Sequence, residues 1–507
     1  MVPFGSLPRV VSRRQIGLLS GPVVFAGLLS ISPFGISPSA NAALASTLWV
    51  ATWWVTEAVP IPVTSLLPIV LFPLTGVVDV AAATAPYADP VVFLLLGGFL
   101  LALAVERWGL HRRIALAVVA FVGVRSTRLL LGFMLATAFL SMWISNSATA
   151  MLMVPIGTAV IVAFDTQQES DPPSEADENE LLAGVRTAPD RRSESDFALA
   201  LMLGIAYSAS IGGAATLIGS PPNAVFAGVA ESRLDVRISF LDWLVFAGPL
   251  SAVFLLASWG LLVKLLRPEI PSNCGAETVI RRQREALGPI SRGERRVLAI
   301  FVLVAAGWLL RPFVLQPLFP AITDTVVAIV GGVLLFVVPA DHENREFLLE
   351  WGDTTRVPWG VLLLLGAGFS LASGFQASGL DVVVAERLAG FAGVPLVALL
   401  LIVATVVVFL TEVTSNTATA TVFMPIMISL GSTVGVSPLT LMATAALGAS
   451  FAFMLPVATP PNAVVFGSGY VRIPQMSRVG VWLNLLGIVA LVVLTYLWLP
   501  IALSIAG

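Results

Sequence analysis

The chain has 507 residues, of which 57% are hydrophobic and 11% charged, and its formal net charge is −3. Its mean hydropathy of +0.94 lies far outside the range of soluble globular proteins. The single cysteine, Cys274, excludes a disulfide within the chain, and the two histidines, His111 and His342, lie in charged connectors without metal-ligand spacing. The composition therefore predicts an integral membrane protein.

Apolar runs of about 20 residues, long enough to cross the hydrocarbon core of a bilayer, recur along the chain. The first run lacks a cleavage site followed by a soluble domain, so we expect a retained helix and not a signal peptide. We predict eleven membrane-spanning helices, near residues 16–36, 42–59, 62–80, 91–110, 198–218, 240–263, 297–317, 323–340, 358–379, 441–466 and 481–505.

Arginines in the connectors predict the orientation. The connectors after residue 107, from 264 to 296 and from 467 to 480 are basic, and placing all three in the cytoplasm puts the N-terminus inside and the C-terminus outside. The stretch 165–196 holds ten Asp or Glu residues against three Arg, a composition typical of a disordered acidic loop.

One unusual motif occurs twice. Residues 141–156 read SMWISNSATAMLMVPI and residues 411–426 read TEVTSNTATATVFMPI, with seven of sixteen positions identical at an offset of 270. Each copy is followed by a Pro-Pro-Asn-Ala-Val string, at 221–225 and at 460–464. A single string of small residues more often permits helix packing, but two such pairs favour one binding site built from two halves.

The eleven predicted crossings alternate consistently only if the two motif segments do not cross the membrane. Segments 128–164 and 394–431 are apolar but broken by polar strings, which predicts re-entrant hairpins that line a cavity. The segment 91–110 also resembles 361–380, and the two run in opposite directions in this topology. We therefore expect two inverted repeats.

Four irregular segments are predicted to meet near the middle of the membrane. Two are the hairpin tips at 145–147 and 415–417, and two are breaks at 219–223 and 458–462, where consecutive prolines end regular helix. Carbonyl, hydroxyl and amide oxygens suit Na⁺, and free N–H groups at helix starts suit an anion. None of the four segments contains Arg or Lys, so we expect a pocket without fixed positive charge, in which bound cations neutralise the anion.

Three carboxylates lie near these segments. Glu412 adjoins the second motif, and we expect it to face away from an anion site, towards a donor on its own hairpin. Glu57 and Glu106 lie near membrane boundaries, where an orientation or structural role is the favoured interpretation. No nucleophile–base pair or metal cluster occurs in the apolar sequence, which disfavours a membrane enzyme.

With these motifs, the chain resembles the divalent anion:sodium symporter family (solute carrier family 13 and its bacterial and archaeal relatives). The resemblance covers nearly the whole length, including ATWWVTEAVPIPVTSLLPIVLFPLTGV at 51–77, and ASFAFMLPVATPPNAVV at 449–465 fits the family signature. It implies a homodimer that works as an elevator. The first motif departs from dicarboxylate-transporting relatives at Ser147, where they usually have Thr, so the choice of anion stays open.

The resemblance also implies site residues. The first sodium site comprises Ser141, Ser145, Asn146 and the carbonyl of Gly219, and the second comprises Thr411, Ser415, Asn416 and the carbonyl of Ala458. The substrate-binding residues are Asn146, Ser147, Ser220, Asn416, Thr417, Thr459 and Pro460. Ser141 and Thr411, both hydroxyls four residues before the motif serine, share the offset of 270.

We therefore predict an all-α integral membrane protein of the plasma membrane that imports a small divalent anion together with sodium ions. C4-dicarboxylates are the leading substrate class, with sulfate and tricarboxylates behind. We expect no catalysis, no organic cofactor and no nucleic-acid partner, and contacts with membrane lipid. The expected organisation is 1–40 for the N-terminal segment and first helix, 41–264 for the first repeat with its broken helix at 198–230, 265–296 for a cytoplasmic basic linker, and 297–507 for the second repeat. The alternatives are a sodium-independent dicarboxylate exchanger, a sulfate:sodium symporter, and, more distantly, an anion channel or a structural membrane protein.

Overall fold

The computed structural model describes residues 13–32, 35–123, 126–168, 196–268, 276–341 and 346–506. Within these ranges, nine helices are long and apolar enough to cross a membrane. A tenth joins them if Leu380–Phe391 and Leu396–Thr411, bent by 117°, form one span. The predicted all-α membrane fold is confirmed, while most of the predicted acidic loop, from 169 to 195, lies outside the described residues.

The first half of the chain is helical throughout its described part. Its elements are α1 (Arg13–Ile31), α2 (Pro38–Thr56), α3 (Ile61–Thr64), α4 (Leu67–Thr75), α5 (Val80–Thr84), η1 (Ala85–Ala88), α6 (Pro90–Arg107), α7 (Leu110–Val122), α8 (Ser126–Ser141), α9 (Asn146–Gln168), α11 (Asp196–Ala214), α12 (Pro221–Leu234) and α13 (Phe240–Leu266). The interruption between α8 and α9 coincides with the first motif.

The second half adds one small pair of antiparallel strands. Its elements are α14 (Ala276–Ala286), α15 (Arg292–Leu310), η2 (Arg311–Leu315), α16 (Gln316–Leu318), α17 (Asp324–Val337), β1 (Pro339–Asp341), β2 (Glu346–Phe347), η3 (Trp351–Arg356), α18 (Trp359–Ser378), α19 (Leu380–Leu388), η4 (Ala389–Phe391), α20 (Leu396–Thr411), α21 (Asn416–Val434), α22 (Pro438–Gly448), α23 (Pro460–Gly467), α24 (Ile473–Leu497) and α25 (Leu499–Ala506). The second motif likewise falls between two helices, α20 and α21.

Two kinds of local structure differ from the sequence-based expectation. The span expected at 62–80 is divided into α3 and α4, because proline lies at the start of each and the chain turns at Ser65–Leu66. The basic connectors after 107 and from 265 to 296 contain the helices α7 and α14. On α7, Leu116 and Val119 are buried while Arg112 is exposed, so this helix is amphipathic. Its charged residues made the segment resemble a basic connector in the sequence.

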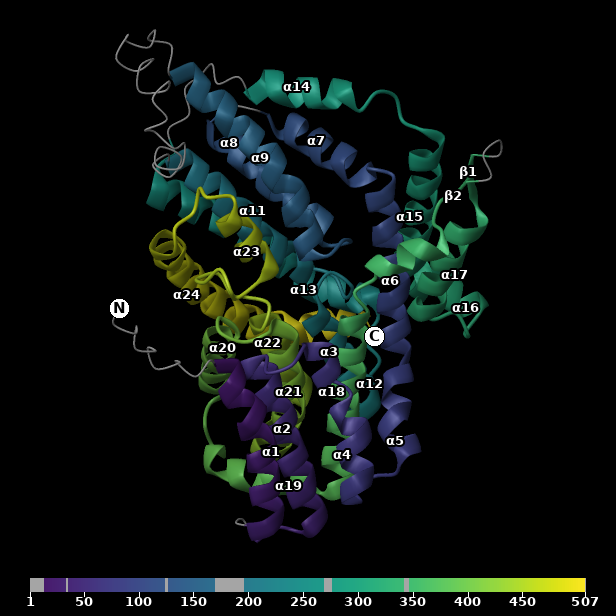
Figure 1. Ribbon diagram of the computed structural model, residues 1–507, viewed down its shortest axis with the longest axis vertical. Coiled ribbons are helices and arrows are strands. Elements are labelled where there is room, and N and C mark those ends of the chain that lie inside the picture. Colours follow the sequence, from purple (N-terminus) through teal and green to yellow (C-terminus); the bar gives the residue numbers. More distant parts are fainter. Residues whose placement is uncertain are drawn as a thin grey trace, which may run out of the picture.

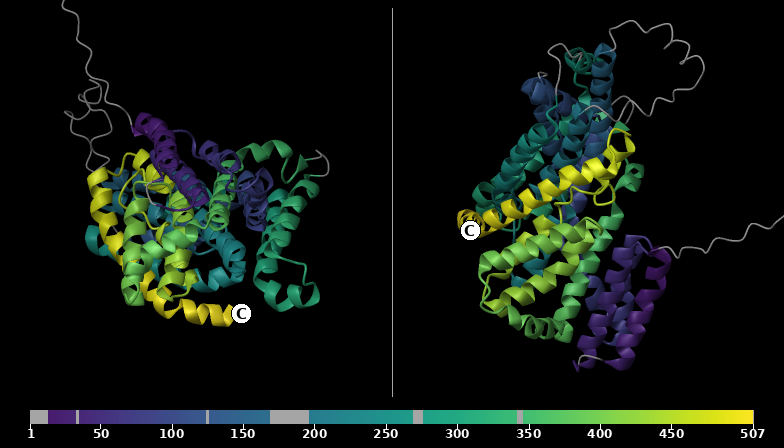
Figure 2. Two further views of the ribbon diagram at one scale, coloured as in Figure 1. Left: turned by 90° about the horizontal axis from the view of Figure 1, so that it is seen from below. Right: turned by 90° about the vertical axis from the view of Figure 1, so that its left-hand side faces the viewer.

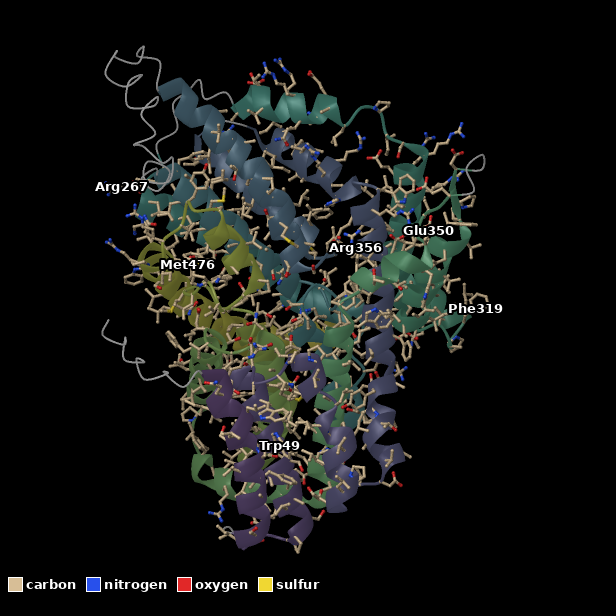
Figure 3. The ribbon with its side chains drawn as sticks, viewed as in Figure 1. Trp49, Arg267, Phe319, Glu350, Arg356 and Met476 are labelled. Atoms are coloured by element: carbon tan, nitrogen blue, oxygen red, sulfur yellow. The ribbon has the colours of Figure 1, made fainter. Side chains whose placement is uncertain are left out.

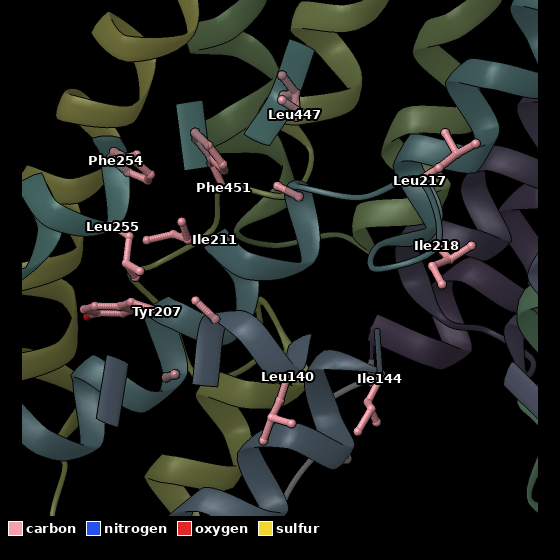
Figure 4. Packing of buried hydrophobic residues seen from close by; sticks show 14 of the residues in the cluster. Leu140, Ile144, Tyr207, Ile211, Leu217, Ile218, Phe254, Leu255, Leu447 and Phe451 are labelled. Atoms are coloured by element: carbon pink, nitrogen blue, oxygen red, sulfur yellow. The ribbon is translucent and has the colours of Figure 1, made fainter. Parts of the chain in front are cut away.

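Helix α11 forms the centre of the upper part of the molecule. Every residue from Phe197 to Ala214 is buried, as expected for a helix that is apolar on all sides. It packs against α8, α9, α13 and α23. Figure 4 shows part of this core, in which Tyr207 and Ile211 of α11 lie near Phe254 and Leu255 of α13.

The two motif hairpins lie in different parts of the molecule. Figure 1 shows α8 and α9 in its upper part and α20 and α21 in its lower part, and the second view of Figure 2 shows the same separation. The helix pairs α11–α12 and α22–α23 each run from one part towards the other and are interrupted between them. This arrangement brings two tips and two breaks to the middle of the fold.

Candidate functional site: two hairpin tips and two broken helices

Both motif asparagines begin a helix. Asn146 is the first residue of α9 and Asn416 the first residue of α21, so each tip presents the backbone N–H end of a helix. Ser415 precedes Asn416 as the N-cap residue with extended backbone, and its side chain makes no capping bond. Ser145 holds the same position at the first tip, where its hydroxyl accepts from Ala148 N at 3.3 Å. Both tips therefore place polar side chains at a positive helix end.

Each asparagine is tied to the hydroxyl residue that precedes it by five positions. Ser141 Oγ lies 2.6 Å from the Asn146 amide oxygen and 2.7 Å from the carbonyl oxygen of Ala209 in α11. Thr411 Oγ1 lies 2.7 Å from the Asn416 amide oxygen and 3.0 Å from the carbonyl oxygen of Ala449. The same polar triplet is thus built twice, once in each half of the chain.

The first triplet has a fourth member. One end of the Asn146 amide lies 2.6 Å from Ser141 Oγ, 3.2 Å from the carbonyl oxygen of Ala209 and 3.3 Å from that of Gly219. An amide nitrogen in this position donates to these oxygens. In this orientation the Asn146 amide satisfies the oxygens of Ser141, Ala209 and Gly219, which are of the kind that hard cations also prefer.

Two further asparagines hold the breaks in shape. The Asn223 amide nitrogen donates to the carbonyl oxygens of Gly213 at 3.1 Å and Thr216 at 2.7 Å. The Asn462 amide nitrogen donates to those of Ala452 at 3.1 Å and Leu455 at 3.0 Å. Because the helix is interrupted before each Pro-Pro pair, these carbonyls lack helical N–H partners, and the asparagine side chains supply donors instead. The repeated Pro-Pro-Asn string therefore both makes each break and caps it.

Glu412 supports the second break from behind the site. This carboxylate is buried, and its two oxygens accept from the backbone N–H groups of Phe453, Met454 and Leu455 at 2.7, 2.9 and 3.1 Å. The Asn484 amide of α24 donates to it at 2.7 Å. Glu412 does not line the cavity described below, so it faces away as expected, but the prediction of a donor on its own hairpin is wrong. The backbone donors that bind Glu412 belong to the second break and not to the hairpin.

A single cavity of about 1360 Å³ brings the tips and breaks together. The predicted site residues on its wall are Ser145, Asn146, Ser147, Gly219, Ser220, Ser415, Asn416, Thr417, Ala458, Thr459 and Pro460. Ser141 and Thr411 lie directly behind the wall, hydrogen-bonded to the asparagines. Ser220 Oγ also lies 3.1 Å from Ser450 Oγ, which links the first break to the second.

The charge of this cavity differs from the sequence-based expectation. The predicted absence of fixed positive charge is wrong, because Arg14 and Arg356 both line the wall. Glu57 and Glu106, interpreted as boundary residues, line it as well. None of the four belongs to the two hairpin motifs or to the Pro-Pro breaks, so those motifs carried no signal for them. The two arginines come from α1 and η3, which the sequence analysis did not connect with the site.

An apolar wall completes the cavity. Phe99, Ala102 and Leu103 of α6 line it, together with Ile218 beside the first break. In the described part of the chain, no three His, Cys, Asp or Glu side chains gather as a metal-binding group. Apart from Arg14, Glu57, Glu106 and Arg356, the polar side chains that line the cavity are hydroxyls and amides, whose oxygens are hard ligands.

Comparison with known proteins gives consistent matches. The sodium:sulfate symporter transmembrane region family matches residues 16–505. A protein named sodium-dependent dicarboxylate transporter SdcS from Staphylococcus saprophyticus is 41% identical over 97% of this chain and 92% of its own length. The protein of the same name from Staphylococcus aureus (strain USA300) is also 41% identical, over the same shares of both chains.

The solved structure of the Alcanivorax borkumensis YdaH transporter, described as having an unusual topology, is similar in fold. Its TM-score is 0.53 with 17% sequence identity, and the match covers 83% of this chain and 88% of that one. At this identity the likeness concerns the fold alone. The family match and the two relatives extend over nearly the whole chain, and the protein belongs to the sodium:sulfate symporter family, that of the divalent anion:sodium symporters.

Proposed function

We propose that this protein is a secondary active transporter that imports a small divalent anion, with C4-dicarboxylates as the leading class, together with sodium ions. The observation that carries the proposal is the polar triplet built once behind each hairpin tip, Ser141–Asn146–Ala209 and Thr411–Asn416–Ala449, with both asparagines on one cavity. The names of the two staphylococcal relatives support the same substrate class.

In this proposal each triplet belongs to one sodium site. Ser141, Ser145, Asn146 and the Gly219 carbonyl hold the first ion, and the Ala209 carbonyl adds a further oxygen. Thr411, Ser415, Asn416 and the Ala458 carbonyl hold the second ion, with the Ala449 carbonyl beside them. Without sodium, the Asn146 amide nitrogen donates to the oxygens of Ser141, Ala209 and Gly219, and in this proposal the ion replaces it as their partner.

The anion lies between these ions. Its contacts are the side chains of Asn146, Ser147, Ser220, Asn416, Thr417 and Thr459, with Pro460 closing the wall. Helix starts at Asn146 and Asn416 offer N–H groups and a positive dipole end to its carboxylates. Sodium binding first turns the two amide oxygens inward and adds positive charge, so it raises anion affinity through a coupling free energy between the sites.

The larger organisation follows from the two halves. Hairpins in opposite parts of the fold, with tips on a common cavity, support two inverted repeats of the kind that move a central site across the membrane. We propose a homodimer in the plasma membrane, surrounded by lipid, that works as an elevator. Its N-terminus is cytoplasmic and its C-terminus lies outside, as the basic connectors indicate. Transport without chemical conversion of the anion is the activity proposed here.

The test is uptake of labelled succinate and sulfate into proteoliposomes with an inward sodium gradient. We expect succinate uptake to exceed sulfate uptake and to fall to background when choline replaces sodium. Equal uptake in sodium and choline contradicts sodium coupling. Uptake of sulfate alone keeps the coupling but overturns the substrate class.

A sodium-independent exchanger is the second candidate, because Arg14 and Arg356 provide fixed positive charge on the cavity wall. In an exchanger these cations, and not bound sodium, neutralise the anion. Succinate loaded inside the vesicles then accelerates uptake of labelled succinate in choline medium. Acceleration in choline supports the exchanger, and its absence together with sodium-driven uptake supports the symporter.

A further inference from the structure

The charges on the cavity wall are unevenly distributed. The tip residues that line it are neutral, and the charged side chains among its described lining are Arg14, Glu57, Glu106 and Arg356. Figure 3 labels Arg356 towards the middle of the molecule, beside α6, while Glu350 of the same segment lies nearer the outer edge. Arg356 is therefore in a position to meet an anion within the cavity, outside the polar tips.

The partner of Arg356 is a carboxylate on the same wall. Its Nη2 lies 3.0 Å from Glu106 Oε2, and the two side chains are 54% and 17% exposed. This pair uses one end of the guanidinium, and much of the side chain faces open space. Because Arg356 is the exposed member of the pair, an incoming carboxylate can reach its guanidinium while Glu106 stays against the wall.

The backbone that carries Arg356 is fixed more firmly than its side chain. Arg107, the neighbour of Glu106 at the end of α6, pairs with Asp353 and lies 3.2 Å from Glu346 and 3.3 Å from Glu350. These contacts tie the segment from β2 through η3 to α6. The guanidinium of Arg356 can thus change partners while the segment stays in place.

Arg14 is the weaker candidate for meeting the anion. Its Nε donates to the backbone carbonyl of Glu57 at 3.0 Å, and the side chain is exposed. Arg356 is instead bound to the chemical group that a dicarboxylate presents. A guanidinium can form two parallel hydrogen bonds with a carboxylate. The single contact between Arg356 and Glu106 leaves that capacity partly unused.

We propose that Arg356 is the residue that first captures the anion, exchanging the carboxylate of Glu106 for a carboxylate of the substrate before the anion reaches the hairpin tips. This inference rests on the proposed function and adds a step to it. A cation in a cleft concentrates anions near it and accelerates their association. Glu106 holds the guanidinium in position when no anion is present and competes with the anion for it.

The two members of the pair have opposite expected effects, which makes the experiment selective. With saturating sodium, we expect Arg356→Gln to raise the KM for succinate about fivefold, because one charged contact is lost. Glu106→Gln removes the competitor, so it lowers KM. Neither variant changes kcat by more than about twofold, because the tips are intact. Added choline chloride narrows the gap between wild type and Arg356→Gln through screening.

The matched control is Arg237→Gln. Arg237 does not line the cavity and forms an ion pair with Glu231 at 2.8 Å, with 66% of its side chain exposed. We expect the KM of Arg237→Gln to equal that of wild type. Thermal unfolding in detergent verifies that all three variants are folded.

Two outcomes overturn the inference while leaving sodium-driven succinate uptake by wild type intact. One is an unchanged KM in Arg356→Gln. The other is a KM that changes in the same direction in Arg356→Gln and Glu106→Gln. That result indicates an ion pair with a purely structural role in the cavity wall. Failure of the proposed function is recognised separately, because wild type itself then shows no sodium-driven uptake of a dianion.

Discussion

The two broken helices carry the same motif but are supported by different chemistry. The first break, from 215 to 220, is short, and it is held by Asn223 and by the Thr216 hydroxyl, which donates to the Met142 carbonyl. The second break, from 449 to 459, is longer and needs Glu412 in addition to Asn462. At the offset of 270, Met142 occupies the place of Glu412. The hairpin-tip residues and the break asparagines repeat, while the support at positions 142 and 412 has diverged.

The divergence has a physical reason. The longer second break leaves three consecutive backbone N–H groups, at 453–455, without helical partners in a buried region. A carboxylate with two acceptor oxygens can serve them all, whereas a methionine side chain cannot. At the first break, by contrast, the backbone N–H of Gly219 donates to a local acceptor, the Thr216 hydroxyl, at 3.1 Å.

The largest expected effect comes from the residues that repeat. Asn146→Ala and Asn416→Ala should each reduce sodium-driven succinate uptake to background. Each substitution removes an amide that lines the cavity and that is hydrogen-bonded to the hydroxyl behind it. The amount of folded protein in detergent should match wild type. For each variant, both succinate uptake and the unfolding temperature are measured. If one variant transports normally, the two halves do not contribute equally to the site, and their equivalence is contradicted.

A smaller effect, on stability and not on binding, is expected behind the site. Glu412→Ala leaves three backbone donors and the Asn484 amide unpaired, and each buried unpaired donor costs about 1–3 kcal/mol. The unfolding temperature should fall strongly. Met142→Ala, the matched change in the first half, should cost about 1 kcal/mol.

Glu412→Gln sharpens this second prediction. The amide keeps one acceptor oxygen but turns an NH₂ group towards a backbone donor, so its stability should lie between wild type and Glu412→Ala. The amount of protein unfolded at each temperature is followed by tryptophan fluorescence. Equal unfolding temperatures for Glu412→Ala and Met142→Ala contradict the proposed difference in support.

The smallest expected effect is at the contact between the two breaks. Ser220 Oγ and Ser450 Oγ are buried and 3.1 Å apart, and this bond should contribute about 0.5–1.5 kcal/mol. Ser220→Ala, Ser450→Ala and the double variant form a cycle whose coupling energy isolates the pair. A coupling energy of zero shows that the breaks are held independently. Ser220→Ala should also raise the KM for succinate, because this hydroxyl lines the cavity.

Much of the site could be predicted from the sequence, because internal repetition and consecutive prolines are local signals. The tips at Asn146 and Asn416 and both Pro-Pro breaks lie between helices as expected. The donors to Glu412 could not be predicted, since they are backbone groups far along the chain. Arg356 was missed for a similar reason, because only the packing of η3 against α6 brings it to the cavity. The roles of the site residues in binding stay predictions.

The size of the cavity has a consequence for selectivity. At about 1360 Å³ it exceeds the usual range of small-molecule sites, about 300–1,000 Å³, and far exceeds a four-carbon diacid. In the proposed transporter, a cavity of this size does not enclose the anion sterically, so the polar groups at the hairpin tips select it. Under that proposal, Ser147, which lacks the methyl group of Thr, is a determinant of the choice of anion.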